Sequence, residues 1–289
     1  MSEMDEFLVI GVDGGGSGCR AVIARRDGPV LGHGRAGPAN ATTDPELAIA
    51  NARAAIEAAV LAAGLTTGPQ VAHLGLAGAL TADVQARIAD GCGVPRATVS
   101  DDLETALAGA LGAGDGILVS VGTGSVLAGR KGGAVSRIGG WGLQVSDQAS
   151  GAWLGRCLME RVLLCHDGLL PHSELTRAVL DEFTGGALGI VAFASHAAPG
   201  DFAALAPRIV SAAGADLHAG AILGEGADYL SQAIRALDGG AGLPICLTGG
   251  LGPAYAPLLG DLSRRIVPAK GTALDGALQL ARAAAERLK

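Results

Sequence analysis

Short apolar runs of strand length recur along the first third of the chain, each closed by glycine or aspartate within two residues. Such runs are typical of buried β-strands. Asp27-Gly28 is a hairpin signal between the second and third runs. Helical patterns then alternate with strand patterns, and Thr43–Glu46 has the arrangement of a capping box at the first helix. We predict strands over 7–12, 19–26, 29–34, 71–76 and 97–100, and helices over about 43–63, 81–89 and 103–111.

The same order of patterns then starts again. An apolar run is followed by the glycine turn Gly122–Ser125 and by two further strand-like runs. Two such units do not fit easily into one sheet, so we predict an α/β protein with two lobes, residues 1–115 and 116–271. The elements predicted for the second part are strands over 116–121, 126–130, 134–138 and 244–247, helices from about 150, a long helix over about 207–237 and a last helix over 272–288.

The composition indicates a folded protein and argues against two classes of partner. Of the 289 residues, 49% are hydrophobic and 17% are charged, which suffices for a real core and excludes a disordered chain. The net charge is -7 and no basic surface is concentrated in the sequence, so we expect no nucleic-acid partner. No apolar stretch has membrane-spanning length, and residues 1–6 are acidic without the features of a secretory signal. We therefore expect a cytoplasmic protein that does not enter a membrane.

Both predicted lobes place a glycine turn directly after their first strand. A phosphate group that approaches backbone N–H groups needs a turn without side chains in the way, and glycine provides one. A tight hairpin explains either turn alone, but two turns at equivalent places favour phosphate contacts from both lobes. The candidate phosphate-binding residues are Gly14, Gly15, Gly16, Ser17, Gly122, Thr123, Gly124 and Ser125, with the three hydroxyl groups as additional donors.

Other phosphate and metal motifs are missing or misplaced. The P-loop pattern G-x-x-x-x-G-K-[ST] does not occur. Residues 32–37 match G-x-G-x-x-G, but Pro38 follows and no helix opens there, so we reject a dinucleotide fingerprint. The five cysteines and six histidines lack the spacing of a zinc site or a disulfide framework.

Four aspartates lie where predicted strands or loops end. Asp13 lies at the end of a buried strand, where an unpaired charge would be costly. A Mg²⁺ ion on nucleotide phosphates would be a partner for this charge. The alternative is that Asp13 forms hydrogen bonds within the turn and has no metal-binding role. Asp101 or Asp102 can cap the next helix or act as a general base at the carboxyl end of a strand. Asp147 lies in a glycine-rich loop before a helix, and its purely structural role would be to cap that helix.

In this order, the motifs resemble those of the BadF/BadG/BcrA/BcrD-type ATPases and, within that group, the N-acetylglucosamine and glucosamine kinases. The resemblance runs nearly end to end. The motifs that carry it are Asp13–Ser17, Gly75–Gly78, Ser100–Asp102, Gly122–Ser125, Gly139–Gly142, Thr248–Gly252 and residues 268–281. It implies two ribonuclease H-like lobes of the actin and sugar-kinase superfamily with a central cleft, and a last helix, 272–289, that packs back on the first lobe. It also implies an ATP- and Mg²⁺-dependent kinase that phosphorylates an amino sugar at its 6-hydroxyl.

The resemblance implies roles for individual residues as well. Asp13 would hold Mg²⁺, and Thr248, Gly249 and Gly250 would line the adenosine. Asp102 would be the base on the sugar hydroxyl, because the family's aspartate lies five residues before an apolar helix position, here Leu107. The contacts to the sugar would come from Asn40, Asp102 and Asp147.

Two departures from the family pattern fall near the expected sugar pocket. Where the family usually has Gly-Asp-Glu-Gly-Ser, residues 146–150 read Ser-Asp-Gln-Ala-Ser, and Val126 stands where N-acetylglucosamine kinases often have asparagine. Kinase chemistry stays expected, whereas the choice between glucosamine and N-acetylglucosamine stays open.

Two other functions are alternatives to a sugar kinase. An ATPase that activates a partner enzyme would need cluster-binding cysteines in the loop around 147–151, where none occurs. A sugar-sensing regulator would have kept the fold and lost transfer. The sequence leaves the oligomeric state open, a homodimer included.

Overall fold

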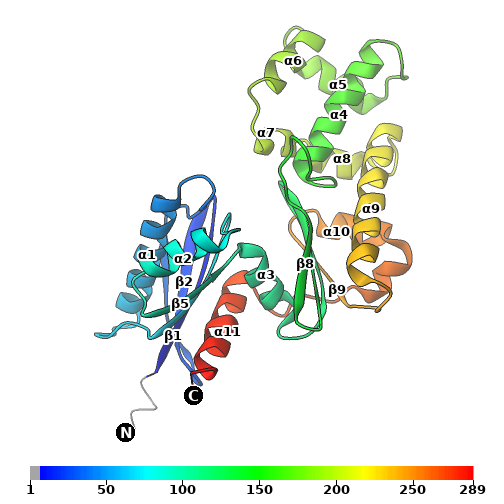
Figure 1. The fold of residues 1–289 in the computed structure, drawn as a ribbon. Helices are drawn as coiled ribbons and strands as arrows, with labels where there is room; N and C mark the ends of the chain where they lie inside the picture. Colours follow the sequence, from blue (N-terminus) through cyan, green and yellow to red (C-terminus); the bar gives the residue numbers. More distant parts are fainter. Residues whose placement is uncertain (1–6, 289) are drawn as a thin grey trace. The chain divides into compact units, whose positions relative to one another are not determined.

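The structure is a computed structural model that describes residues 7–288, so the prediction made on the acidic residues 1–6 lies outside the described residues. By its internal contacts the chain divides into two units, Met1–Gly114 with Ala269–Lys289, and Asp115–Pro268. Each unit is built on its own β-sheet with helices packed against it (Figure 1). None of the helices in the described range is long and apolar enough to cross a membrane.

The sheet of unit 1 has the strand order β3-β2-β1-β4-β5, in which β1 is antiparallel to β2 and parallel to β4. The strands are β1 (Leu8–Gly15), β2 (Gly18–Arg25), β3 (Val30–Ala36), β4 (Val71–Leu76) and β5 (Arg96–Ser100), and the helices are α1 (Pro45–Ala62), α2 (Ala82–Gly91), α3 (Asp102–Leu111) and α11 (Ala273–Glu286). Successive residues of β1 face opposite sides of the sheet. Ile10 lies in the core with α1, whereas Val9 lies in the core with α11.

Glycine in β3 lets α1 approach the sheet closely. A Cβ atom at Gly34 would lie 1.9 Å from the carbonyl oxygen of Ala55 in α1, where no side chain fits. The G-x-G-x-x-G pattern at 32–37 therefore reflects helix-on-sheet packing, in agreement with its rejection as a nucleotide motif.

Glycine also brings α11 against α3. A Cβ atom at Gly276 would lie 2.0 Å from the carbonyl oxygen of Thr105, so the two helix backbones are in direct contact. This contact fixes α3, and with it the position of Asp102, which is the first residue of α3. The last helix thus belongs to unit 1 although it follows unit 2 in the sequence.

The sheet of unit 2 has the strand order β8-β7-β6-β9, with β6 antiparallel to β7 and parallel to β9. Its strands are β6 (Gly116–Val121), β7 (Ser125–Lys131), β8 (Ala134–Gly139) and β9 (Ile245–Thr248). Its helices are α4 (Gly151–His166), α5 (Glu174–Glu182), α6 (Ala187–Ala194), α7 (Pro199–Ala203), α8 (Ala206–Ala212), α9 (Leu217–Asp238) and α10 (Gly252–Tyr255), followed by short 3₁₀ turns at Ala256–Leu258 and Gly260–Arg265. The core lies between β6, β7 and helices α4 and α9.

Two local predictions were wrong. Asp44, not Thr43, is the N-cap of α1, because its carboxylate accepts a hydrogen bond from the N–H of Leu47 at 3.0 Å, and Pro45 is the first helical residue. The long helix predicted over 207–237 is two helices. It is interrupted before Asp216, whose carboxylate caps α9 by accepting from the N–H groups of His218 and Ala219.

Candidate active site

The first glycine turn, between β1 and β2, is tighter than the sequence suggested. The strands continue to Gly15 and resume at Gly18, so that only Gly16 and Ser17 form the turn. A Cβ atom at Gly14 would lie 2.5 Å from the Leu76 side chain, so this glycine is required for packing. At Gly15 and Gly16 a Cβ atom would meet nothing within 4 Å. Thus no atom of the described residues occupies the space next to the turn at these two glycines.

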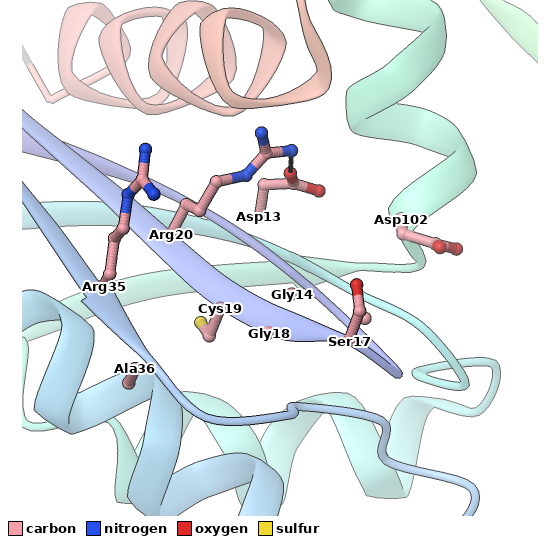
Figure 2. Close-up of a pocket in the computed structure, with 10 residues that line it drawn as sticks. Asp13, Gly14, Ser17, Gly18, Cys19, Arg20, Arg35, Ala36 and Asp102 are labelled. Atoms are coloured by element: carbon pink, nitrogen blue, oxygen red, sulfur yellow. Dashed lines mark hydrogen bonds and ion pairs between the residues drawn. The ribbon is translucent and has the colours of Figure 1, made fainter. Parts of the chain in front are cut away.

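Most of the predicted residues of unit 1, all except Gly16 and Asn40, line a hollow of about 510 Å³. Figure 2 shows Ser17 at the turn, Asp13 on β1 and Asp102 at the start of α3. The lining residues are Asp13, Gly14, Gly15, Ser17, Gly18, Cys19, Arg20, Arg35, Ala36 and Asp102. The hollow thus combines two carboxylates, two guanidinium groups and an open glycine turn.

Asp13 has a protein partner that sequence reasoning missed. Its carboxylate oxygen Oδ2 lies 2.5 Å from a guanidinium nitrogen of Arg20, drawn as a dashed line in Figure 2. From the sequence we considered Mg²⁺ or hydrogen bonds in the turn as partners of this charge, and did not consider an arginine. The partner could have been found by counting back from the two-residue turn, which places Asp13 opposite Arg20; on the next strand Arg35 lies opposite Arg20. A row of one anion and two cations crosses the sheet beside the turn.

The two adjacent aspartates have separate positions. Asp101 is the N-cap of α3, and its carboxylate accepts a hydrogen bond from the N–H of Glu104 at 3.1 Å. Asp102 is exposed and lines the hollow. Of the two aspartates that could cap the helix, the structure thus assigns this role to Asp101.

Asn40 lies beside this site but does not line the hollow. Its side-chain oxygen accepts hydrogen bonds from the N–H groups of Thr42 and Thr43, at 2.9 and 3.3 Å. The preceding residue, Ala39, donates its N–H to the carbonyl oxygen of Gly15 at 2.9 Å. Asn40 is therefore tied to the end of β1 through its neighbour in the chain.

In unit 2, helix α4 sets the direction of the peptide groups in the second glycine turn. The first N–H groups of α4, on Gly151 and Ala152, donate to the carbonyl oxygens of Gly122 and Thr123 at 2.8 and 3.1 Å. In a trans peptide the N–H points away from the carbonyl oxygen. The N–H groups of Thr123 and Gly124 consequently point away from α4, and neither has a partner in the part of the chain that the structure describes. Two adjacent outward N–H groups form a concavity suited to an anion.

The other predicted residues of unit 2 differ in whether they are open to a ligand. Ser125 is buried and its hydroxyl donates to the carbonyl oxygen of Gln148 at 2.6 Å, so it is not available as the predicted phosphate donor. Thr248 ends β9, the strand parallel to β6. Gly249 has a φ of +82° and its Cβ atom would lie 2.2 Å from the carbonyl oxygen of Val121, so only glycine fits there. Gly250 borders open space.

Asp147 is held against the same turn. It is 9% exposed and adopts a left-handed φ of 60°. Its carboxylate oxygen Oδ1 accepts from the N–H of Gly142 at 3.3 Å, and a Cβ atom at Gly124 would lie 2.8 Å from Oδ2. It does not cap α4, which was the structural alternative for this residue; the hydroxyl of Ser150 accepts from the N–H of Trp153 instead. Burial raises the pKa of Asp147, and hydrogen bonds from the N–H groups of Gly142 and Ser125 and the charge of Arg137 partly offset this shift.

Ala149 is left-handed too, with a φ of 69°, although it is fully buried. This backbone conformation costs an alanine roughly 1–2 kcal/mol. A glycine would lose about 0.8 kcal/mol of methyl burial and about 0.4–1 kcal/mol through the greater freedom of the unfolded chain. The two sums are about equal, so alanine is tolerated where the family usually has glycine.

Comparison with known proteins places this geometry in context. The model of the BadF/BadG/BcrA/BcrD ATPase family matches residues 10–272. The chain is 32% identical over 279 residues to glucosamine kinase GspK of Vibrio cholerae serotype O1, covering 94% of this chain and 95% of that protein.

Solved structures give the same picture of the fold. A Chromobacterium violaceum protein, whose proposed activity is N-acetylglucosamine kinase, superposes with a TM-score of 0.82 at 36% identity, over 95% of this chain and 99% of that one. A ROK family glucokinase from Streptomyces griseus, solved with glucose and AMPPNP, superposes with a TM-score of 0.53 at 18% identity, over 96% and 99%, and shares the fold alone. The predicted α/β fold class and the predicted family resemblance are confirmed.

The raised pKa of Asp147 predicts how its removal affects stability. Because the folded-state pKa lies above the ordinary value of 3.8, the charged carboxylate destabilises the fold above the folded-state pKa, and this cost vanishes as pH falls below the ordinary value. Asp147→Asn cannot titrate. We expect its thermal midpoint, relative to wild type, to rise as pH goes from about 3 to about 7, measured by calorimetry. A relative midpoint that falls with pH would show that the charged form is the stabilised one.

Proposed function

The chain belongs to the BadF/BadG/BcrA/BcrD ATPase family, and we propose that it is an ATP-dependent kinase of an amino sugar, glucosamine or N-acetylglucosamine. Support comes from relatives that match nearly the whole chain and carry these two kinase names. We further propose that the acceptor is the 6-hydroxyl of the sugar and that the protein acts in the cytoplasm, where ATP is present. The roles of the individual residues are also part of the proposal.

One observation carries the proposal: the outward N–H groups of Thr123 and Gly124, which α4 fixes in place. An anion-binding concavity without side chains in the way suits the polyphosphate of a nucleotide. In unit 1 the same demand is met by the open turn at Gly15 and Gly16. We assign these two turns to the phosphates of ATP, and Thr248, Gly249 and Gly250 to its adenosine. The Ser125 hydroxyl anchors the second turn by donating to the Gln148 carbonyl oxygen, and we assign it no hydrogen bond to phosphate.

The residues around Asp13 fit a magnesium ion that arrives with the nucleotide. Mg²⁺ usually takes one or two carboxylates, with substrate phosphates and water as the other ligands. Asp13 supplies such a carboxylate in the hollow, and no group of three potential ligand side chains forms a metal cage among residues 7–288. When bound, Mg²⁺ would neutralise phosphate charge. Arg20, which pairs with Asp13, brings a cation to the same place.

The chemistry assigned to the chain's own residues is proton transfer and positioning. Asp102 accepts the proton of the attacking sugar hydroxyl, while the backbone N–H groups of the turns stabilise charge on the transferred phosphoryl group. Asn40 and Asp147 hold the sugar, the first through its amide and the second through a carboxylate that is buried and raised in pKa. Because Asp147 abuts Gly124, we place a sugar contact directly beside a phosphate contact.

The phosphate assignment predicts that small side chains at open glycines weaken ATP binding. A Cβ atom at Gly15 or Gly122 meets nothing within 4 Å in the protein, so Gly15→Ala and Gly122→Ala should fold normally. Their methyl groups would occupy phosphate space and break charge-assisted hydrogen bonds worth about 1.5–3 kcal/mol each, which weakens binding about ten- to hundredfold. Titration calorimetry with ATP and Mg²⁺ measures this loss.

Matched controls exist in both units. Gly68 and Gly214 also border open space and have no left-handed φ, so Gly68→Ala and Gly214→Ala should bind ATP as wild type does. Equal affinities for Gly122→Ala and Gly214→Ala would refute the phosphate role of the second turn. Gly124→Val is a poorer probe, since its side chain would strike Asp147 before it reached any ligand.

The assignment of the base predicts unequal effects at the two aspartates. Asp102→Asn keeps the shape and removes the basicity, so kcat for transfer to glucosamine or N-acetylglucosamine should fall by about 10²–10⁴ while ATP still binds. Asp101→Asn should cost little turnover, because asparagine caps helices as well as aspartate does. Steady-state kinetics, with thermal unfolding as the folding control, measure both. An inactive Asp101→Asn beside an active Asp102→Asn would reverse the assignment.

A further inference from the structure

A buried histidine lies in the sheet of unit 1 close to the proposed base. His73, on β4, is 6% exposed, and both ring nitrogens have partners on the neighbouring strand β5. Nδ1 lies 2.8 Å from the hydroxyl oxygen of Thr98, and Nε2 lies 3.1 Å from the hydroxyl oxygen of Ser100. Burying a polar ring is costly without such partners, and here both nitrogens are engaged.

The hydrogen-bond chain continues from the ring to the residue before the proposed base. The Ser100 hydroxyl donates to the carbonyl oxygen of Asp101 at 2.9 Å. That carbonyl belongs to the peptide group that joins Asp101 to Asp102. On the other side, the hydroxyl of Thr105 donates to the carbonyl oxygen of Asp102 at 2.9 Å. Both peptide groups that flank Asp102 are thus held by buried hydroxyl groups, since Ser100 is 4% and Thr105 is 0% exposed.

Counting protons gives this chain a direction. Each hydroxyl has one hydrogen to donate, and a neutral imidazole has one N–H. If Nε2 carries the hydrogen, Thr98 donates to Nδ1, Nε2 donates to Ser100, and Ser100 donates to Asp101. These bonds, of 2.8, 3.1 and 2.9 Å, are then all made, and only the 3.2 Å contact from Thr98 to the Ala72 carbonyl is given up. With the hydrogen on Nδ1, Ser100 would have two acceptors for one proton, and one of the shorter contacts would be lost.

We infer that His73 is a positioning residue for Asp102, and that its neutral ring, with the hydrogen on Nε2, holds the Ser100 hydroxyl on the Asp101 carbonyl and so fixes the peptide group that aims the base. This inference rests on the proposed function, in which Asp102 is the base. A general base misplaced by about 1 Å can cost up to about 10²-fold in rate. A rigid, fully bonded chain behind an exposed carboxylate meets that demand.

The environment of the ring is consistent with this role. Burial lowers the pKa of His73 to about 4, so the ring is neutral at physiological pH. The strands on both sides of β4 are parallel to it, and His73 pairs in register with Gly11 and Thr98. An apolar residue could fill the same space in the sheet, whereas only a side chain with a donor at the Nε2 position can hold Ser100.

Two substitutions at His73 separate positioning from packing. The amide of asparagine reaches the Nδ1 position and leaves Ser100 without its donor, whereas the amide of glutamine reaches the Nε2 position. We expect His73→Asn and Ser100→Ala to lower kcat about tenfold or more with an unchanged KM for ATP, and His73→Gln to retain most of the turnover. Ser100→Ala removes a single oxygen atom, so it serves as the test if the histidine variants fold poorly.

The same substitutions in the Asp102→Asn background decide whether the effect passes through the base. If His73 acts by aiming Asp102, His73→Asn and Ser100→Ala should cause no further loss once the carboxylate is gone. An equal loss in both backgrounds, or wild-type kcat for both variants, overturns the inference. Wild-type protein that transfers phosphate to no sugar would instead sink the proposed function.

A spectroscopic readout keeps the inference testable in that case. Long-range ¹H–¹⁵N correlation of His73 should show a neutral ring protonated at Nε2. The carbonyl ¹³C shift of Asp101 should change in His73→Asn and Ser100→Ala, and should remain near wild type in His73→Gln. A ring protonated at Nδ1, or a carbonyl shift unaffected by any variant, contradicts the proposed chain.

Discussion

The opposed directions of N–H and C=O in a trans peptide determine what the second glycine turn can do. No cis peptide bond occurs in the described range. The first N–H groups of α4 bind the carbonyl oxygens of Gly122 and Thr123. The N–H groups in the same two peptide groups, which belong to Thr123 and Gly124, must therefore face away from α4. Neighbouring contacts keep this arrangement in place: the Ser125 hydroxyl ties the turn to Gln148, and the Tyr255 hydroxyl donates to the Ala149 carbonyl at 2.8 Å. The proposed anion binding would thus be a consequence of how the chain satisfies the end of a helix.

The loop before α4 contains backbone and charge arrangements that are energetically unfavourable. Among the described residues, Asp147 and Ala149 are the non-glycine residues with a left-handed backbone, and both lie in this loop. Asp147 is also a carboxylate with reduced access to water. Neither feature helps the chain to fold, and such outliers cluster at functional sites. The proposed sugar contact beside the phosphate would explain why a costly aspartate lies against Gly124.

The strands and the two glycine turns could be predicted from the sequence, because buried strands give continuous apolar runs and turns without side chains require glycine. The position of Asp101 followed from the same local rules. What could not be predicted depends on contacts between distant residues or on competition between neighbours. Asp44 displaced Thr43 as the cap, and Asp216 ended one helix run and began another. The His73 chain needs the pairing of β4 with β5, which no local pattern reveals.

The proposed function requires that phosphate reach a sugar. The most direct measurement incubates the protein with ATP, Mg²⁺ and, separately, glucosamine, N-acetylglucosamine, glucose and glycerol, and quantifies phosphorylated products by mass spectrometry, with ¹H–³¹P correlation to locate the phosphate. We expect a monophosphate of glucosamine or N-acetylglucosamine that carries the phosphate on the 6-oxygen, formed in step with ADP. ADP released at the same rate with and without sugar, and no sugar phosphate from either amino sugar, would contradict it.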